Sequence, residues 1–157
     1  MTYVSAEKEH GAEGSSCPFC DLPTRGDDAR TYILYRGARA FVIMNLYPYN
    51  NGHLMVIPYA HVDSLAALDE PTLTEMMTLA QRSQAVLSER MGPQGFNIGI
   101  NQGRAGGAGI ADHIHMHVLP RWVADANFMT VVGETRVLPE TLETTWKNLR
   151  EKLASLP

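Results

Sequence analysis

The sequence predicts an α+β fold, with about five strands in an antiparallel sheet and two main helices. Short runs of β-branched, aromatic and apolar residues come before and after one long stretch of helical periodicity. The first runs are joined by links short enough for hairpins. A doubly wound parallel sheet would instead need regular alternation of strands and helices.

Length and composition fit one globular domain. The chain has 157 residues, 45% of them apolar and 19% charged, with a net charge of -4. This charge gives no electrostatic footprint for a long nucleic-acid strand, and no apolar run reaches the length of a membrane span. The polar start of the chain does not resemble a secretory signal, so we expect a cytoplasmic protein whose two cysteines do not form a structural disulfide.

The first cysteine marks the boundary between an N-terminal tail and the globular domain. Residues 1–16 offer almost nothing to bury, and we expect them to form a flexible tail before a single domain over residues 17–157. Cys17-Pro18-Phe19-Cys20 opens that domain. Two cysteines at this spacing can bind zinc from a tight turn, but the spacing also fits a redox pair or two free thiols.

Three strands are predicted in the first half of the domain. Residues 31–35 and 40–44 are rich in β-branched and aromatic side chains, and residues 36–39 fit a hairpin turn between them. Residues 45–51 form a loop with proline and asparagine, and residues 53–58 form the third strand.

The second half contains both predicted helices and the other two strands. Asp69 is a predicted N-cap, and apolar residues recur at helical spacing over residues 72–91 until a glycine–proline pair. Residues 95–101 form a strand. A loop over residues 123–133 separates the sheet from a final amphipathic helix over residues 139–153.

Residues 112–121 read Asp-His-Ile-His-Met-His-Val-Leu-Pro-Arg and predict a half-buried strand that ends near Pro120. Alternate residues of a strand face opposite sides, so His113, His115 and His117 (the histidine row) share one face. The apolar residues between them are expected to pack on the other face: Ile114, Met116 and Val118. Folding does not require three imidazoles in register, so the histidine row indicates chemistry.

Two separated motifs together resemble the histidine triad (HIT) superfamily. The first is the histidine row with its flanking residues, and the second is Gly-His-Leu-Met-Val-Ile-Pro over residues 52–58. The resemblance extends over about residues 17–153 and implies a HIT-like fold. It is strongest to the diadenosine polyphosphate hydrolases and diadenosine tetraphosphate phosphorylases, which implies a small nucleotide substrate cleaved at its α-phosphate.

The resemblance also implies roles for particular residues. His115 matches the nucleophile, which would form a nucleotidyl-histidine intermediate. His117 matches a phosphate contact, and His53 matches a fourth histidine that positions or polarises. The implied substrate contacts are Asn45, Gln102, Gly107, Gly109 and His117; the glycine-rich loop over residues 102–109 could also offer backbone donors to phosphate.

Zinc-bearing members of the superfamily resemble this chain at four positions, which here are Cys17, Cys20, His61 and His113. The resemblance therefore implies a structural zinc site of two cysteines and two histidines. It also implies a homodimer, with the helix over residues 72–91 at the two-fold axis.

The chain departs from several hydrolases of the superfamily just before the histidine row, where Gly109-Ile110 replaces a glutamine followed by a hydroxyl residue. The motifs therefore leave open whether water or phosphate is the acceptor. Two other functions also remain open. One is a hydrolase whose catalytic zinc is bound by the histidine row, and the other is a nucleotide-binding module without turnover.

Overall fold

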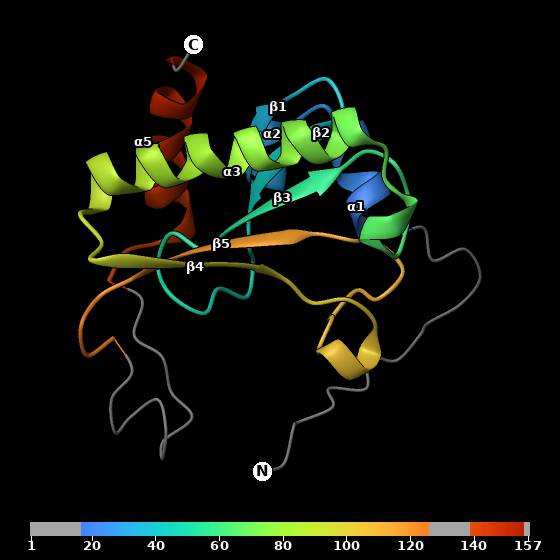
Figure 1. Ribbon diagram of the computed structural model, residues 1–157. Coiled ribbons are helices and arrows are strands. Elements are labelled where there is room, and N and C mark those ends of the chain that lie inside the picture. The colour runs from blue at the N-terminus through green and yellow to red at the C-terminus, as the bar shows by residue number, and fades with distance from the viewer. Residues whose placement is uncertain (1–16, 126–138, 156–157) are drawn as a thin grey trace.

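The computed structural model describes residues 17–125 and 139–155 (Figure 1). The predicted flexible tail over residues 1–16, and most of the loop predicted over residues 123–133, lie outside the described residues.

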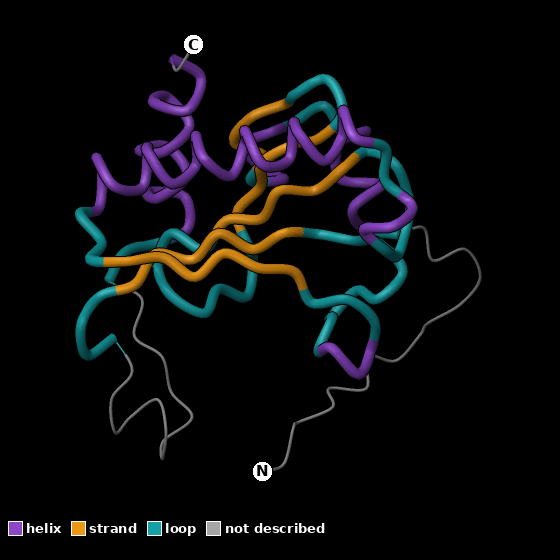
Figure 2. The backbone as a smooth tube through the Cα atoms, in the orientation of Figure 1, coloured by secondary structure: helices purple, strands orange, loops and turns teal. Residues whose placement is uncertain are grey.

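A five-stranded antiparallel sheet forms the centre of the molecule, as the sequence predicted (Figure 2). Its strands are β1 (Ile33–Arg36), β2 (Ala40–Met44), β3 (Leu54–Pro58), β4 (Gly95–Ile100) and β5 (Met116–Arg121). Their order across the sheet is β1-β2-β3-β5-β4. β5, which contains the last member of the histidine row, His117, therefore lies inside the sheet, between β3 and β4.

Two helices cover one face of this sheet. The helix α3 (Glu70–Met91) begins at Asp69, whose carboxylate accepts a hydrogen bond from the backbone N–H of Thr72 at 3.0 Å, and it ends at Gly92 in the left-handed conformation. The helix α5 (Leu142–Ser155) packs against α3 and β1 (Figure 1). Buried side chains from both helices meet those from the strands in the larger core: Leu34, Val42, Met44, Val56, Met76, Leu79, Leu87, Met116, Val118, Leu149 and Leu153.

The opposite face of the sheet carries a smaller core, to which α1 (Pro18–Asp21) contributes Phe19. Two further short helical segments follow, η1 (Leu22–Arg25) and α2 (Asp28–Thr31), and Arg150 of α5 reaches Asp28 of α2. The sequence did not predict these segments. The buried members of this core are Phe19, Ile33, Phe41, Ile43, Met55 and Ile57. The predicted start of the first strand at Thr31 is wrong, because Asp27 caps α2 and Tyr32 turns the chain with a φ of 58°.

The strand at the histidine row is also shorter than predicted. β5 begins at Met116, so His113 and His115 precede it. β3 and β5 separate there: the N–H of Ile114 donates to the carbonyl of Val62 at 2.7 Å, and the ring of His113 lies 2.9 Å from the carbonyl oxygen of Pro58. The expected burial of the intervening apolar residues is nevertheless observed, at 2% exposed for Ile114 and 8% for Met116.

The strand ends near Pro120, as expected, although β5 continues for one further residue to Arg121. The carbonyl of Arg121 accepts from Gln94 N–H on the β4 side. The backbone groups of Pro120, one residue earlier, therefore face the other way, past the end of β3, where its carbonyl oxygen lies 3.4 Å from the side-chain nitrogen of Asn50. The missing N–H of proline thus removes no hydrogen bond from the sheet.

Candidate active site and metal centre

Four side chains from separate parts of the chain converge at one end of β5. Every pair among the potential ligand atoms of Cys17, Cys20, His61 and His113 lies within 4.8 Å, and the two cysteines are not joined by a disulfide. The Nδ1 atom of His113 lies 3.3 Å from Sγ of Cys17, 3.6 Å from Sγ of Cys20 and 3.2 Å from Nδ1 of His61. The residues predicted as ligands could therefore hold one metal ion.

The chemistry of this donor set fits zinc. Bonds of about 2.3 Å to sulfur and about 2.0–2.1 Å to nitrogen would separate tetrahedral ligands by roughly 3.3–3.8 Å, close to the distances seen. The carbonyl of Pro58 can only accept a hydrogen bond, so Nε2 of His113, 2.9 Å away, carries the proton. Nδ1 of His113 is then left with a lone pair directed at the two sulfurs, as metal-binding histidines require.

His115, the central member of the histidine row, is 4% exposed. Its Nδ1 lies 2.9 Å from the carbonyl oxygen of His113, so Nδ1 is protonated and donates. Burial lowers the pKa of His115, which keeps the ring neutral. Its Nε2 atom therefore carries a lone pair and is the atom that can act as a nucleophile.

A chain of hydrogen bonds also fixes the tautomers of the two remaining histidines. The backbone N–H of Tyr49 donates to Nδ1 of His53 at 3.1 Å, so Nδ1 of this buried ring is an acceptor. The proton of His53 is then on Nε2, which lies 2.9 Å from Nδ1 of His117 and donates to it. His117 consequently keeps its own proton on Nε2.

Burial, and to a lesser extent the neighbouring His115, lower the pKa of His117 from 6.5 to about 4. At neutral pH the side chain is therefore an uncharged hydrogen-bond donor. The ring centroids of His115 and His117 lie 4.9 Å apart, with the ring planes at 75° to each other.

Both histidines line a cavity of about 380 Å³, which is large enough for one small organic ligand. Three of the other predicted site residues also line it: Asn45, Gly107 and Gly109. Most of the remaining wall is apolar and comes from α1, β2 and the loop that follows β2: Pro18, Phe19, Ile43, Met44, Leu46, Tyr47 and Tyr49.

Two predicted residues lie elsewhere. His53 is behind His117 and reaches the cavity through that ring. The side chain of Gln102 is not part of the cavity wall; its Oε1 atom accepts from the backbone N–H of Leu65 at 3.2 Å, and the neighbouring Asn101 lines the cavity instead. The sequence did not single out Asn101, although its place at the end of β4 beside the glycine-rich loop was a usable signal.

Phe19 links the metal cluster to the cavity, and no pattern in the sequence singled it out. It lies between the two cysteines in α1 and is 5% exposed. Its ring centroid is 5.6 Å from that of His113 and 5.0 Å from that of His115, both with edge-to-face geometry. The segment that carries two metal ligands thus also packs against the potential nucleophile.

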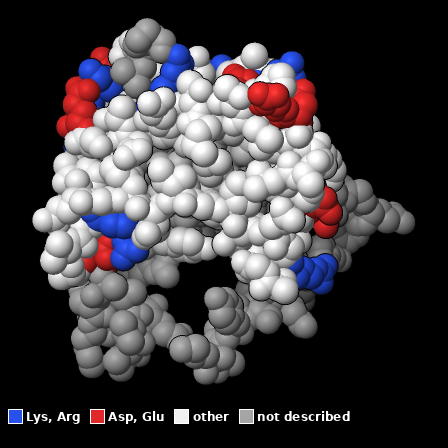
Figure 3. Space-filling model, viewed as in Figure 1, with Lys and Arg blue, Asp and Glu red and all other residues white. Residues whose placement is uncertain are grey.

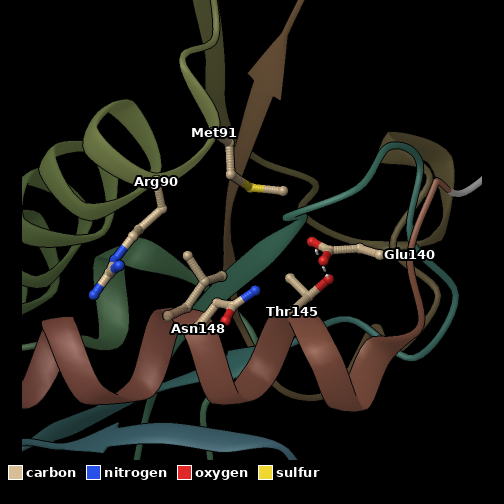
Figure 4. Close-up of a pocket in the computed structure, with 6 residues that line it drawn as sticks. Arg90, Met91, Glu140, Thr145 and Asn148 are labelled. Atoms are coloured by element: carbon tan, nitrogen blue, oxygen red, sulfur yellow. Dashed lines mark hydrogen bonds between the residues drawn. The ribbon is translucent and has the colours of Figure 1, made fainter.

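Another hollow lies between the end of α3 and α5, away from the histidine row (Figure 4). Thr145 donates to Glu140 at 2.8 Å and also contacts Asn51, which joins α5 to the loop before β3. The other labelled residues are Arg90, Met91 and Asn148, and the hydroxyl of Thr145 is buried, with its side chain held by Glu140 and Asn51. We assign no chemistry to it.

The fold and the site define a class of protein. It has a five-stranded antiparallel sheet, two helices on one face, and on the other face a small cavity lined by two neutral histidines with fixed tautomers. The chain belongs to the HIT family, because the HIT domain model matches residues 27–123.

Named relatives agree with this assignment. The chain is 39% identical over 140 residues, 89% of its length, to the AP-4-A phosphorylase of Mycobacterium tuberculosis, of which it covers 71%. It is 33% identical over 93 residues to the asymmetrical bis(5'-nucleosyl)-tetraphosphatase of Schizosaccharomyces pombe, covering 59% of this chain and 50% of the relative.

Solved structures with the same fold include a zinc-bound histidine triad family protein from Mycobacterium smegmatis. It is 30% identical to this chain with a TM-score of 0.71, and the match covers 88% of this chain and 94% of that one. The Plasmodium falciparum diadenosine triphosphate hydrolase, at 15% identity and a TM-score of 0.62 over 80% of this chain and 76% of that one, shares the fold.

Proposed function

We propose that this HIT-type enzyme cleaves dinucleoside polyphosphates, such as diadenosine polyphosphates, at an α-phosphate by transferring the nucleotidyl group to His115. The observation that carries this proposal is the pair of fixed tautomers in one cavity: a neutral His115 with its lone pair on Nε2, beside His117 with its proton on Nε2. The names of the two curated relatives support the substrate class.

In the first step, Nε2 of His115 attacks the α-phosphorus. A phosphorus–nitrogen bond forms as the bond to the bridging oxygen breaks, and the remaining polyphosphate leaves with the electron pair of that bond. In this proposal, Nε2–H of His117 donates a hydrogen bond to the leaving oxygen, on which negative charge develops. His53 positions His117 for this role.

In the second step, an acceptor oxygen attacks the same phosphorus and the bond to His115 breaks. Asn45 is proposed as a ribose contact, and the amides near Gly107 and Gly109 as phosphate donors, since all three residues line the cavity. A phosphate contact by Gln102 stays a prediction that requires its side chain to leave Leu65.

The acceptor can be identified from the products. Transfer to inorganic phosphate converts diadenosine tetraphosphate to ADP and ATP, whereas transfer to water gives AMP and ATP. Turnover should therefore be measured with and without phosphate, and the nucleotide products separated.

Trapping the intermediate tests the proposal. We expect rapid acid-free quenching during turnover to yield protein whose mass is increased by one nucleotidyl group, mapped to His115. His115→Asn should abolish both this adduct and turnover, while still binding the nucleotide. Unchanged turnover in His115→Asn would contradict the assigned nucleophile, and binding without any turnover in the parent protein would favour a nucleotide-binding module.

For the metal cluster we propose structural zinc. Among the described residues, His113 is the one member of the histidine row that joins the cluster, and the other three ligands complete a closed set. This arrangement argues against the hydrolase in which the histidine row binds a catalytic zinc. It also suits a cytoplasmic protein, because both thiols must stay reduced to bind metal.

We also propose a homodimer formed through α3 and β4. In the described chain, β4 pairs only with β5, which leaves its other edge open. Met77 is 59% exposed and Ile98 44%, and both line a shallow hollow between α3 and β4. Figure 3 shows that the centre of this face lacks charged side chains, which lie around its periphery. An uncharged face beside an open strand edge suits a second copy of the chain.

A further inference from the structure

The mouth of the cavity has an apolar rim formed by the loop after β2. Three large side chains of this loop are exposed, Leu46 at 47%, Tyr47 at 73% and Tyr49 at 44%, and all three line the cavity. Large apolar side chains exposed together in one place often mark a binding site.

The backbone of this loop is held in place. The N–H of Tyr47 donates to Oδ1 of Asn45 at 2.9 Å, and the N–H of Tyr49 donates to His53. At the far end of the loop, Gly52 has a φ of 76°, and a Cβ there would lie 2.7 Å from the sulfur of Met91. The rim is therefore already arranged before a ligand binds, which reduces the entropy lost on binding.

The size of the cavity limits how much substrate it encloses. Its volume of about 380 Å³ is near the lower end of the range of about 300–1,000 Å³ for pockets that bury one drug-sized ligand. The inner wall around Phe19, Ile43 and Met55 therefore accommodates one nucleoside. A dinucleoside polyphosphate carries a second nucleoside, which must lie outside that wall.

The rim lies on the side where this second nucleoside leaves. The ring of Tyr49 has its centroid 4.7 Å from that of His53 and 6.1 Å from that of His117, the proposed donor to the leaving oxygen. Nucleobases stack on aromatic side chains without needing specific hydrogen bonds.

We propose that Tyr47 and Tyr49 form a stacking subsite for the second nucleobase, the one on the departing half of a dinucleoside polyphosphate. This inference rests on the proposed function and extends it: the rim makes the enzyme prefer dinucleotides over mononucleotides that carry the same polyphosphate chain. Tyr47 is the better residue to change, because Tyr49 also touches two histidines of the site.

The test compares diadenosine tetraphosphate with adenosine 5'-tetraphosphate, which has the same number of phosphates and no second base. The measured quantity is the ratio of kcat/KM for the dinucleotide to kcat/KM for the mononucleotide. Tyr47→Ala should lower this ratio by about 5- to 30-fold, the effect of losing about 1–2 kcal/mol of base stacking. In Tyr47→Trp and Tyr47→Phe the ratio should stay close to that of the parent protein, because both variants keep an aromatic face.

Val123→Ala is the matched control, since Val123 is 80% exposed and does not line the cavity; it should leave the ratio unchanged. The thermal midpoints of all variants should agree, because the substituted side chains are exposed. An unchanged ratio in Tyr47→Ala would overturn the subsite. A ratio that falls as far in Tyr47→Trp and Tyr47→Phe as in Tyr47→Leu would overturn it as well. Absence of turnover of both nucleotides by the parent protein would instead contradict the proposed function.

Discussion

The Nδ1 atom of His115 lies 2.9 Å from the backbone carbonyl oxygen of His113, whose own ring faces the metal cluster. The residue that can hold the metal therefore also fixes the tautomer of the proposed nucleophile. The two functions share one stretch of backbone, so the metal can influence catalysis without touching the substrate.

This relationship gives a prediction for Cys17→Ser. We expect the zinc content to fall from one ion per chain and the thermal midpoint to drop by on the order of 10 °C, because a metal that joins distant segments contributes to folding. The value of kcat should fall much less than in His115→Asn. Metal analysis of protein purified without added zinc, with calorimetry and kinetics on the same samples, provides the measurements.

Asp21→Asn is the control for that experiment, since Asp21 adjoins Cys20 and pairs with Arg25 on the surface. It should retain its zinc and lose little stability. Full stability of the parent protein without bound metal would contradict the structural role. Chelation that abolishes activity while the fold stays intact, with recovery in other divalent ions, would favour a catalytic metal instead.

For His53, the hydrogen-bond chain predicts an effect on kcat that exceeds the effect on binding. In His53→Ala, nothing donates to Nδ1 of His117 from this position, so His117 can adopt the wrong tautomer. We expect kcat to fall by about 10- to 100-fold, as is typical when a positioning partner is lost. His53→Gln, which can still donate, should recover part of it; equal rates in both variants would refute the tautomer argument.

The pKa of His117 predicts how stability depends on pH. Because folding lowers this pKa from 6.5 to about 4, the unfolded chain binds the proton more readily. The contribution of His117 to stability is therefore complete above pH 6.5 and is lost as the pH falls from 6.5 towards 4. Urea unfolding of the parent protein and of His117→Asn should differ in slope within this window, with the flatter pH dependence in the variant.

The parent protein must be compared with His117→Asn because the metal ligands also take up protons in acid. Those ligands are present in both proteins, so the difference in slope reports His117. Identical pH dependences would show that His117 titrates normally in the folded protein.

Asp125 anchors the loop that carries the rim of the cavity. Its carboxylate accepts from Arg121 at 2.6 and 2.7 Å and from the side chain of Asn50 at 2.8 Å, and the hydrogen bonds from Arg121 keep the pKa of Asp125 well below its usual range. Asp125→Ala should cost about 1–3 kcal/mol of unfolding free energy near neutral pH and raise KM for the dinucleotide.

The stability effect of Asp125 should diminish only in strong acid. A lowered carboxyl pKa stabilises the fold above the unfolded value near 3.8, and the stabilisation is lost as the pH falls below it. Arg25→Ala removes a more exposed ion pair and should change stability by less than about 0.5 kcal/mol. A similar loss in both variants would contradict the anchoring role.

The homodimer proposal predicts that a charge on the uncharged face separates the protomers. Met77→Glu should convert a dimer to a monomer in light scattering at micromolar concentration, whereas Val123→Glu, elsewhere on the surface, should not. A monomeric parent protein would contradict the proposal.

Patterning was sufficient to predict the sheet and both main helices. The alternation around Ile114 and Met116 correctly predicted that these two residues are buried, because that information is local. The prediction of a half-buried strand is wrong there, because His113 and His115 are buried as well, at 0% and 4% exposed. The ends of β5 could not be predicted in the same way. Whether Pro120 interrupts a strand depends on which neighbour its backbone faces, and that follows from the register with β3 and β4.

The site was predictable in its residue types and less so in its geometry. The direction of the Gln102 side chain depends on a loop in which Gly103 and Gly107 have positive φ values, so strand alternation gives no guide. The tautomers of His53 and His117 depend on a contact between residues 64 positions apart. No local pattern encodes such a contact, although the resemblance to a family brought the two residues to the same site.

Phe19, in the four-residue helix α1, limits which substitutions the site tolerates. Phe19 lies between two potential metal ligands, packs against His115 and forms part of the cavity wall. Any replacement at this position alters the fit of the nucleoside, the contact with the nucleophile and the geometry of the cysteine pair at once. In a saturation screen, variants selected for a different base should therefore rarely change Phe19 and should accumulate at Ile43, which lines the cavity from β2, away from the segments that carry the metal ligands.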